Sequence, residues 1–415
     1  MSANAHQVAP LGLDIESRLS CIDQPKMRRD RLTKLRAELA RRDYAAALLS
    51  DPINIRYASG SRNMSVWTMH APGRYLFVPV DGPVVMFEFQ SSKHLAEKLD
   101  TIDELRTSIP WFHFLSGPRT AEKTSLWAQE IIALMRQYGR TNQRLAVDRC
   151  EPWGAKILTD NGIVLFDAQE PIEFARLIKT PEEMGAMELS MDVCDIAVER
   201  LRQSLRPGIT ENQAWSVLHN TNIIHDGEWI ECRLLASGPR TNPWFQESSN
   251  RQIQPGELVV FDTDMVGPLG YLADISRAYV CPGRRATPEQ RTLYGLALEQ
   301  LSHNISLIRP GVTFREFSEK CWAVPAQFEK NRYMMMVHGS GLVDEYPTIS
   351  YLADSVDWGY DGQFEENMVV CVESYIGADR GPQGIKLEQQ VRITRTGAEV
   401  MSKAPIIDAL ETGAA

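Results

Sequence analysis

The segment "VVFDTDMVGPLGYLADISRAYV" (residues 259–280) places three carboxylates, Asp262, Asp264 and Asp274, among apolar residues typical of core strands. Burying a carboxylate costs free energy unless a partner compensates its charge. The segment therefore predicts a pair of interior strands whose acidic residues share a positively charged partner.

Three further donors interrupt apolar runs later in the chain. His338 lies in "MMMVHGSGLVDEYP", Glu373 in "MVVCVESYIG" and Glu388 in "GIKLEQQVRIT". Five carboxylates and one imidazole placed together would repel one another unless cations lie between them. Oxygen-rich donors with a single nitrogen suit two divalent ions of the manganese, iron, cobalt or zinc kind.

A repeated pattern surrounds these donors. "TPEE" (180–183) opens a helix, "RPG" (206–208) ends it, and "ITENQ" (209–213) begins another; "TPEQ" (287–290), "RPG" (309–311) and "VTFRE" (312–316) repeat that order. The Thr and Glu or Gln spacing is that of a capping box. The repeat predicts that residues 180–400 form one domain of two similar halves, the alternative being two unrelated helix pairs with good caps.

The preceding residues predict a smaller α/β domain. A charged helix over 28–42 and an amphipathic helix over 120–139 alternate with short strand-like runs, found at 45–50, 75–80, 82–89, 144–148 and 162–168. The fold class is therefore α/β. We expect an N-terminal extension at 1–24, the smaller domain at 25–178 and a larger domain at 179–415.

Composition narrows the function classes. The chain has 415 residues and a net charge of −10, without a basic run, which argues against nucleic-acid binding. It shows neither a signal-peptide core nor a long apolar run, so we expect a cytoplasmic protein without a membrane partner. The seven scattered cysteines suggest reduced core residues.

Four short pieces carry a family resemblance. "DISR" (274–277), "VHG" (337–339), "VE" (372–373) and "KLE" (386–388) occur in the order seen in the pita-bread superfamily of methionine aminopeptidases, prolidase and creatinase. The resemblance implies a duplicated α/β metal-binding domain, with ligands in the order Asp, Asp, His, Glu, Glu, behind a smaller α/β domain.

The departures from the peptidases concern spacing and histidines. The peptidases space their first two aspartates eleven apart, whereas Asp262 and Asp264 lie twelve and ten residues before Asp274. "GPRTNPWF" (238–245) has no histidine where the hydrolases have one, and Glu345 stands in place of another. The proton-shuttling histidines expected for peptide hydrolysis are therefore missing.

A third branch is more similar. "FDTD", "GPRTNPWFQE" and "HGSGLVDEYP" resemble the dimethylsulfoniopropionate (DMSP) lyases of the DddP type, which release dimethyl sulfide and acrylate and use iron. The resemblance implies a homodimer that binds a small zwitterion, with Asp344 as catalytic base and Trp67 and Tyr333 as substrate contacts. It also implies that two metal ions are held by Asp262, Asp264, Asp274, His338, Glu373 and Glu388.

The lyase chemistry agrees with these residues. A metal ion can bind the DMSP carboxylate, a carboxylate base can take the α-proton, and aromatic faces can hold the sulfonium. No water is consumed, so no hydrolytic shuttle is needed. Simpler roles stay open: Asp344 as a turn residue, Trp67 and Tyr333 as packing, and Asp262 as a hydrogen-bond acceptor behind the ligands. The competing functions are a proline-specific aminopeptidase or dipeptidase and a catalytically silent binding module.

Overall fold

The computed structural model describes residues 13–406 and residue 410. Contacts between residues divide the chain into two compact units. We call residues 23–180 the N-terminal unit and residues from 181 onward the C-terminal unit, which also includes helix α1 (Ile15–Ser20). Arg18 of α1 forms an ion pair with Asp192 at 2.6 Å, so part of the expected N-terminal extension associates with the C-terminal unit.

The N-terminal unit is a six-stranded mixed sheet in the order β4-β3-β2-β1-β5-β6, with helices around it. Its elements are α2 (Gln24–Arg41), β1 (Ala46–Leu49), α3 (Pro52–Ser59), α4 (Ser65–His70), β2 (Tyr75–Pro79), β3 (Val85–Glu88), β4 (Glu104–Thr107), α5 (His113–Ser116), α6 (Thr120–Leu134), β5 (Arg144–Val147), α7 (Pro152–Asp160), β6 (Val164–Asp167) and α8 (Gln169–Leu177). The strands predicted in this region are all present, with shorter bounds.

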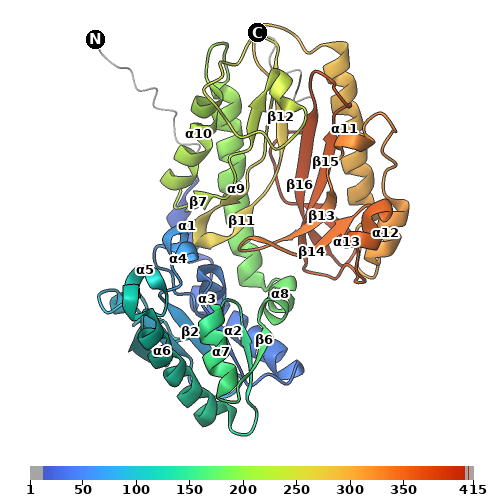
Figure 1. Cartoon of the computed structure of the whole chain (residues 1–415). Coiled ribbons are helices and arrows are strands. Elements are labelled where there is room, and N and C mark those ends of the chain that lie inside the picture. Colours follow the sequence, from blue (N-terminus) through green and yellow to red (C-terminus); the bar gives the residue numbers. More distant parts are fainter. Residues whose placement is uncertain (1–12, 407–409, 411–415) are drawn as a thin grey trace, which may run out of the picture. The chain divides into compact units, whose positions relative to one another are not determined.

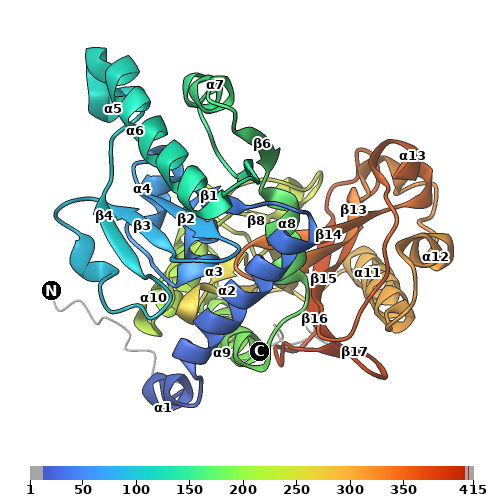
Figure 2. The same cartoon turned by 90° about the horizontal axis from the view of Figure 1, so that it is seen from below.

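Burial on both faces of this sheet explains its apolar strands. Tyr75 and Phe77 of β2 pack in one core with Trp127 and Ile131 of α6. Leu76, which points to the opposite face, is also fully buried. Figure 2 shows α6 on one side of the sheet and α2 and α3 on the other. Helices on both faces of a mixed sheet are typical of an α/β domain.

The C-terminal unit contains helices and antiparallel sheets from both halves of the repeat. Its elements after α1 are α9 (Pro181–Ser204), α10 (Glu211–Ile224), β7 (Trp229–Ile230), β8 (Leu235–Ser237), β9 (Leu258–Phe261), β10 (Met265–Val266), β11 (Leu272–Ala273), β12 (Arg277–Val280), α11 (Pro288–Leu307), α12 (Phe314–Lys320), β13 (Met335–Ser340), β14 (Asp344–Ser350), α13 (Ser355–Trp358), β15 (Val369–Ile376), β16 (Ile385–Thr394) and β17 (Gly397–Val400). The sheet orders are β12-β9-β8, β11-β10-β7 and β14-β13-β15-β16-β17.

The predicted caps begin the helices of both halves. Thr210, Thr287 and Thr313 each form a complete capping box with the residue three positions on. The prediction of helix pairs at these places is confirmed. In the second half α11 runs along β15 and β16, the two strands that carry Glu373 and Glu388 (Figure 1).

The prediction of two core strands over residues 259–280 is wrong in detail. The segment forms four short strands, β9 to β12: Gly267, Pro268 and Gly270 separate β10 from β11, and further breaks at residues 262–264 and 274–276 divide each predicted strand in two. Gly270 has a φ of 78°, a value that favours glycine. The three aspartates consequently lie in the breaks between strands and not within them. None of the helices in the described residues is long and apolar enough to cross a membrane.

Candidate metal centre

The three aspartates are brought together by the turns between β9 and β12. Asp262 and Asp264 lie between β9 and β10, and Asp274 lies between β11 and β12. The Thr263 hydroxyl donates to the Ala273 carbonyl at 3.0 Å and accepts from the Ile275 N–H at 2.9 Å. These two hydrogen bonds join the breaks, so all three carboxylates are buried or nearly so in one place.

The second half supplies its donors from one face of the five-stranded sheet. His338 of β13 lies opposite Cys371 of β15, and Glu373 of β15 lies opposite Glu388 of β16. Cys371 and Glu373 are two residues apart, so their side chains share a face. The antiparallel register therefore collects an imidazole, a thiol and two carboxylates in one buried cluster.

His338 turns one ring nitrogen toward these acids. Its Nε2 lies 3.7 Å from Asp274 Oδ2, 3.5 Å from Glu373 Oε1 and 3.5 Å from Glu388 Oε1. Its Nδ1 lies 3.1 Å from the Gly339 carbonyl and 3.3 Å from Asp344 Oδ1. Acceptors beside Nδ1 favour a proton on that nitrogen, which leaves Nε2 as the nitrogen available to a metal.

Lys386 is a buried cation of the cluster that the sequence reasoning missed. Its Nζ lies 3.0 Å from Asp262, 2.6 Å from Glu373 and 2.9 Å from Glu388. The Ser276 hydroxyl oxygen lies 2.7 Å from Asp262 Oδ1 and accepts from Lys386 Nζ at 2.8 Å. The spacing of "KLE" carried the signal, because residues two apart on a strand share a face.

The raised pKa values of three aspartates show that Lys386 and His338 compensate the buried carboxylate charges only in part. Burial, and then the neighbouring Glu388, raises the pKa of Asp262 well above its usual range. Burial and then Asp264 do the same for Asp274, while burial and Asp344 raise the pKa of Asp264 to about 6. Burial opposes ionisation of Glu388 too, but Lys386 and His338 lower its pKa well below the usual range.

The donor set suits a pair of divalent cations. With neutral His338, the five carboxylates and one ammonium leave four negative charges, which two divalent ions would neutralise. Within the described residues the buried Glu388 Oε1 makes no hydrogen bond beyond the 3.5 Å approach of His338 Nε2. Mixed carboxylate and imidazole donors are consistent with manganese, iron, cobalt or zinc.

Asp344 and Glu345 have different surroundings although they are adjacent. The Asp344 side chain is 55% exposed and borders His338. The Glu345 side chain is buried, and its Oε1 accepts a hydrogen bond from the Leu342 N–H at 2.9 Å within the 341–345 turn. The structure thus brings Asp344 to the cluster. Glu345, which stands at the position of a histidine in the hydrolases, instead accepts a hydrogen bond from its own turn.

Aromatic side chains border the cluster in the C-terminal unit. The Tyr333 ring stacks on Phe245 with centroids 5.4 Å apart, and Lys386 Nζ lies 4.8 Å from the Tyr333 centroid. Trp244 is nearly buried, with its ring 6.0 Å from the same ammonium. Trp67 belongs to the N-terminal unit, where it contacts Phe89 and Phe114, and its substrate role stays a prediction.

Another histidine of the C-terminal unit, His303, and the seven cysteines are further residues of the kinds that bind metals. His303 lies on α11, exposed, where its ring bonds the Lys320 carbonyl and takes no part in the cluster. All seven cysteines are free thiols, as expected. The expectation that they are core residues holds for the buried Cys194, Cys281 and Cys371, but it is wrong for the exposed Cys21 and only partly met by the half-buried Cys150, Cys232 and Cys321. Cys371 also faces the acidic cluster.

Comparison with known sequences defines the class of protein. The chain belongs to metallopeptidase family M24, whose pattern matches residues 185–395, and the creatinase/prolidase N-terminal domain matches residues 31–178. Solved structures agree on the fold. A Bacillus anthracis Xaa-Pro dipeptidase has a TM-score of 0.74 at 19% identity, covering 91% of this chain and 98% of its own. Prolidase from Pyrococcus furiosus has a TM-score of 0.70 at 20% identity, covering 89% and 99%. The pita-bread fold expected from the sequence is confirmed.

Curated relatives narrow the class further. The chain is 37% identical to the dimethylsulfoniopropionate lyase DddP of Roseobacter denitrificans, over 95% of this chain and 89% of the relative. It is 38% identical to the DddP lyase of Roseovarius nubinhibens, over 94% and 89%. An Xaa-Pro dipeptidase of Pyrococcus furiosus is 27% identical over 56% of this chain and 65% of its own.

Proposed function

We propose that this protein is a metal-dependent carbon–sulfur lyase that cleaves DMSP into dimethyl sulfide and acrylate. The observation that carries the proposal is its similarity to two DMSP lyases over nearly its whole length. The geometry of the site supports it, because the Asp344 carboxylate is half-exposed beside the cluster. The sequence also has no histidine at residues 238–245 or 345, where the hydrolases have their proton shuttles.

Six residues would hold the two divalent ions of this centre. They are Asp262, Asp264, Asp274, His338, Glu373 and Glu388. The resemblance to DddP lyases favours iron, and manganese, cobalt and zinc are the alternatives. When bound, the ions supply Lewis-acid stabilisation of the negative charge that develops as the α-proton leaves, worth several kcal/mol.

Asp344 is the proposed base. Burial raises the pKa of its carboxyl, partly offset by His338, which makes the carboxylate a better proton acceptor than a fully solvated aspartate. The Asp344 carboxylate takes the α-proton, the C–H electron pair becomes the new C=C bond, and the C–S pair leaves with neutral dimethyl sulfide. Because half of the side chain is exposed, Asp344 can then return its proton to water.

The aromatic side chains would bind the other end of the substrate. The stacked rings of Tyr333 and Phe245 present aromatic faces beside the cluster. A sulfonium against such a face gains roughly 0.5–2 kcal/mol, by analogy with other organic cations. We include Trp67 as a further contact and a homodimer as the assembly, both on the resemblance alone.

Two assays on the same metal-loaded preparation test the proposal. Gas chromatography of the headspace measures dimethyl sulfide from DMSP, and amino-acid analysis measures release from X-Pro dipeptides. We expect dimethyl sulfide and acrylate in equal amounts and no significant X-Pro cleavage. Prompt X-Pro hydrolysis without sulfide would favour the dipeptidase alternative, which the fold likeness to prolidases supports.

A further inference from the structure

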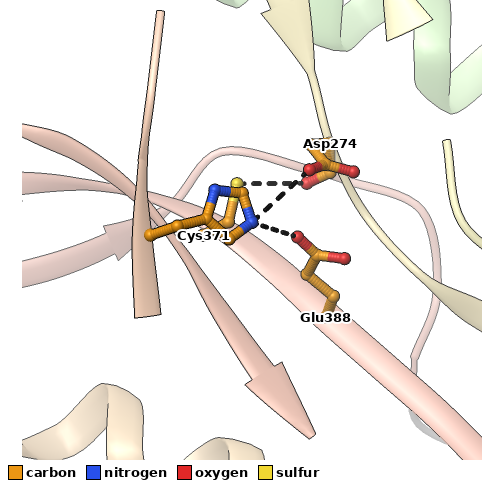
Figure 3. A group of neighbouring side chains, drawn as sticks. Asp274, Cys371 and Glu388 are labelled. Atoms are coloured by element: carbon orange, nitrogen blue, oxygen red, sulfur yellow. Dashed lines mark hydrogen bonds and ion pairs between the residues drawn. The ribbon is translucent and has the colours of Figure 1, made fainter. Parts of the chain in front are cut away.

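Cys371 lies where a ligand of the His338 side of the centre would lie. Its Sγ and one donor atom each of Asp274, His338 and Glu388 all fall within 4.8 Å of one another, and all four residues are buried. Figure 3 shows the side chains of Asp274, Cys371 and Glu388 converging from the break between β11 and β12, from β15 and from β16.

The distances match the edges of a coordination polyhedron. Two ligands that each lie about 2.0–2.3 Å from a tetrahedral ion are about 3.3–3.8 Å apart. His338 Nε2 lies 3.7 Å from Asp274 Oδ2 and 3.5 Å from Glu388 Oε1, both within that range. The remaining separations in the set are no more than 4.8 Å, so small side-chain shifts would complete the polyhedron.

A second observation points to a cation at this place. Within the described residues the buried Glu388 Oε1 makes no hydrogen bond beyond the 3.5 Å approach of His338 Nε2, and it belongs to the same cluster as the sulfur. The other Glu388 oxygen lies 2.9 Å from Lys386 Nζ. A buried carboxylate oxygen whose one close donor is a nitrogen that would itself bind metal is poorly compensated unless an ion completes its shell.

We propose that Cys371 binds the metal ion on the His338 side of the centre as a thiolate, together with Asp274, His338 and Glu388. The Cys371 thiol donates a weak hydrogen bond to the Asp274 backbone carbonyl at 3.8 Å. Metal binding releases the thiol proton to water and replaces that contact by a metal–sulfur bond. The inference rests on the proposed metal centre and adds a soft donor to it, which favours zinc, cadmium or iron over manganese.

X-ray absorption of the zinc-loaded protein tests this ligand directly. We expect a sulfur neighbour at about 2.3 Å alongside nitrogen and oxygen at about 2.0–2.2 Å. Cys371→Ser should abolish the sulfur signal, while Cys281→Ser, which removes a buried thiol outside the cluster, should leave it intact.

Metal preference gives an independent readout that does not use activity. Cys371→Ser should weaken cadmium binding far more than manganese binding, and Cys281→Ser should change neither. Bound zinc with only nitrogen and oxygen neighbours would overturn the thiolate ligand and leave the metal centre standing. A wild-type protein that binds no zinc, cadmium or manganese would overturn the centre and the inference together.

Discussion

The contact between Asp344 and His338 decides how the α-proton abstraction proposed for Asp344 can be tested. The 3.3 Å separation of Asp344 Oδ1 from His338 Nδ1 is compatible with two roles, a base for the substrate or a carboxylate that orients a metal-binding imidazole. Because Nδ1 also lies 3.1 Å from the Gly339 carbonyl, the imidazole has a second orienting acceptor, so it does not depend on Asp344 alone.

Replacing Asp344 separates these roles. Asp344→Asn should lower the rate of dimethyl sulfide release by at least about 100-fold, the size of a general-base contribution, with metal content unchanged. Parallel elemental analysis and headspace assay check this. If metal affinity falls by about 10–100-fold instead, Asp344 is an orienting residue and another group is the base.

Removing the Lys386 ammonium should expose the repulsion among the acids. In the chelated protein we expect Lys386→Met to lower the free energy of unfolding by about 3–5 kcal/mol, because it leaves buried carboxylates without their ammonium partner. Urea unfolding measures the change, and metal loading should recover part of it. Lys386→Arg, which keeps the charge, is the control; equal stability of the Met variant and wild type would contradict the role.

The pairing of helices and strands determines which candidate metal ligands lie close together. The sequence predicted the starts of α10, α11 and α12, since capping boxes are local signals. It also predicted the six carboxylate and imidazole donors that converge. The two-residue spacing placed Lys386 beside Glu388 and Cys371 beside Glu373, but which other donors they meet depends on the register of β13, β15 and β16, which only tertiary pairing sets. The breaks at residues 262–264 and 274–276 were missed because no glycine or proline marks them in the apolar run.

The cap of α11 offers a test at this scale. Thr287→Ala removes the side chain that accepts from the Gln290 N–H, and should lower the free energy of unfolding by about 1 kcal/mol. Thr292→Ala, at an exposed position inside the same helix, should be neutral or slightly stabilising. Urea unfolding compares them; equal losses in both variants would show that the cap contributes nothing specific.

At the scale of the whole molecule, metal binding and folding are coupled. The buried cluster has more carboxylate charge than the Lys386 ammonium neutralises. Divalent ions therefore bind the folded protein in preference to the unfolded chain, which does not hold these carboxylates together. At a free metal concentration 100 times the dissociation constant, binding would stabilise the fold by about 2.7 kcal/mol per ion. Thermal unfolding with and without chelator should therefore give a higher midpoint for the loaded protein; identical midpoints would contradict the coupling.

The pH dependence of that binding follows from His338. Burial opposes its charge, but Asp344, Glu373 and Glu388 raise its pKa well above the ordinary value. In the chelated protein the charged imidazolium of His338, with a proton on each ring nitrogen, is therefore favoured. A metal ion that binds Nε2 must displace the proton on that nitrogen. Metal affinity should fall as the pH drops from about 8 to about 6, by up to tenfold per unit for each proton displaced. Competition with a chromogenic chelator measures this, and an affinity independent of pH would contradict a protonated metal-free cluster.

The dependence of turnover on metal tests the central claim most directly. The protein is stripped with a chelator, dialysed, and titrated with ferrous iron under anaerobic conditions, while bound metal and dimethyl sulfide release are measured on the same samples. We expect no release from the stripped protein and a rate that rises as the centre fills, reaching its maximum near two ions per chain. Full release of dimethyl sulfide from protein that contains no metal would contradict the account.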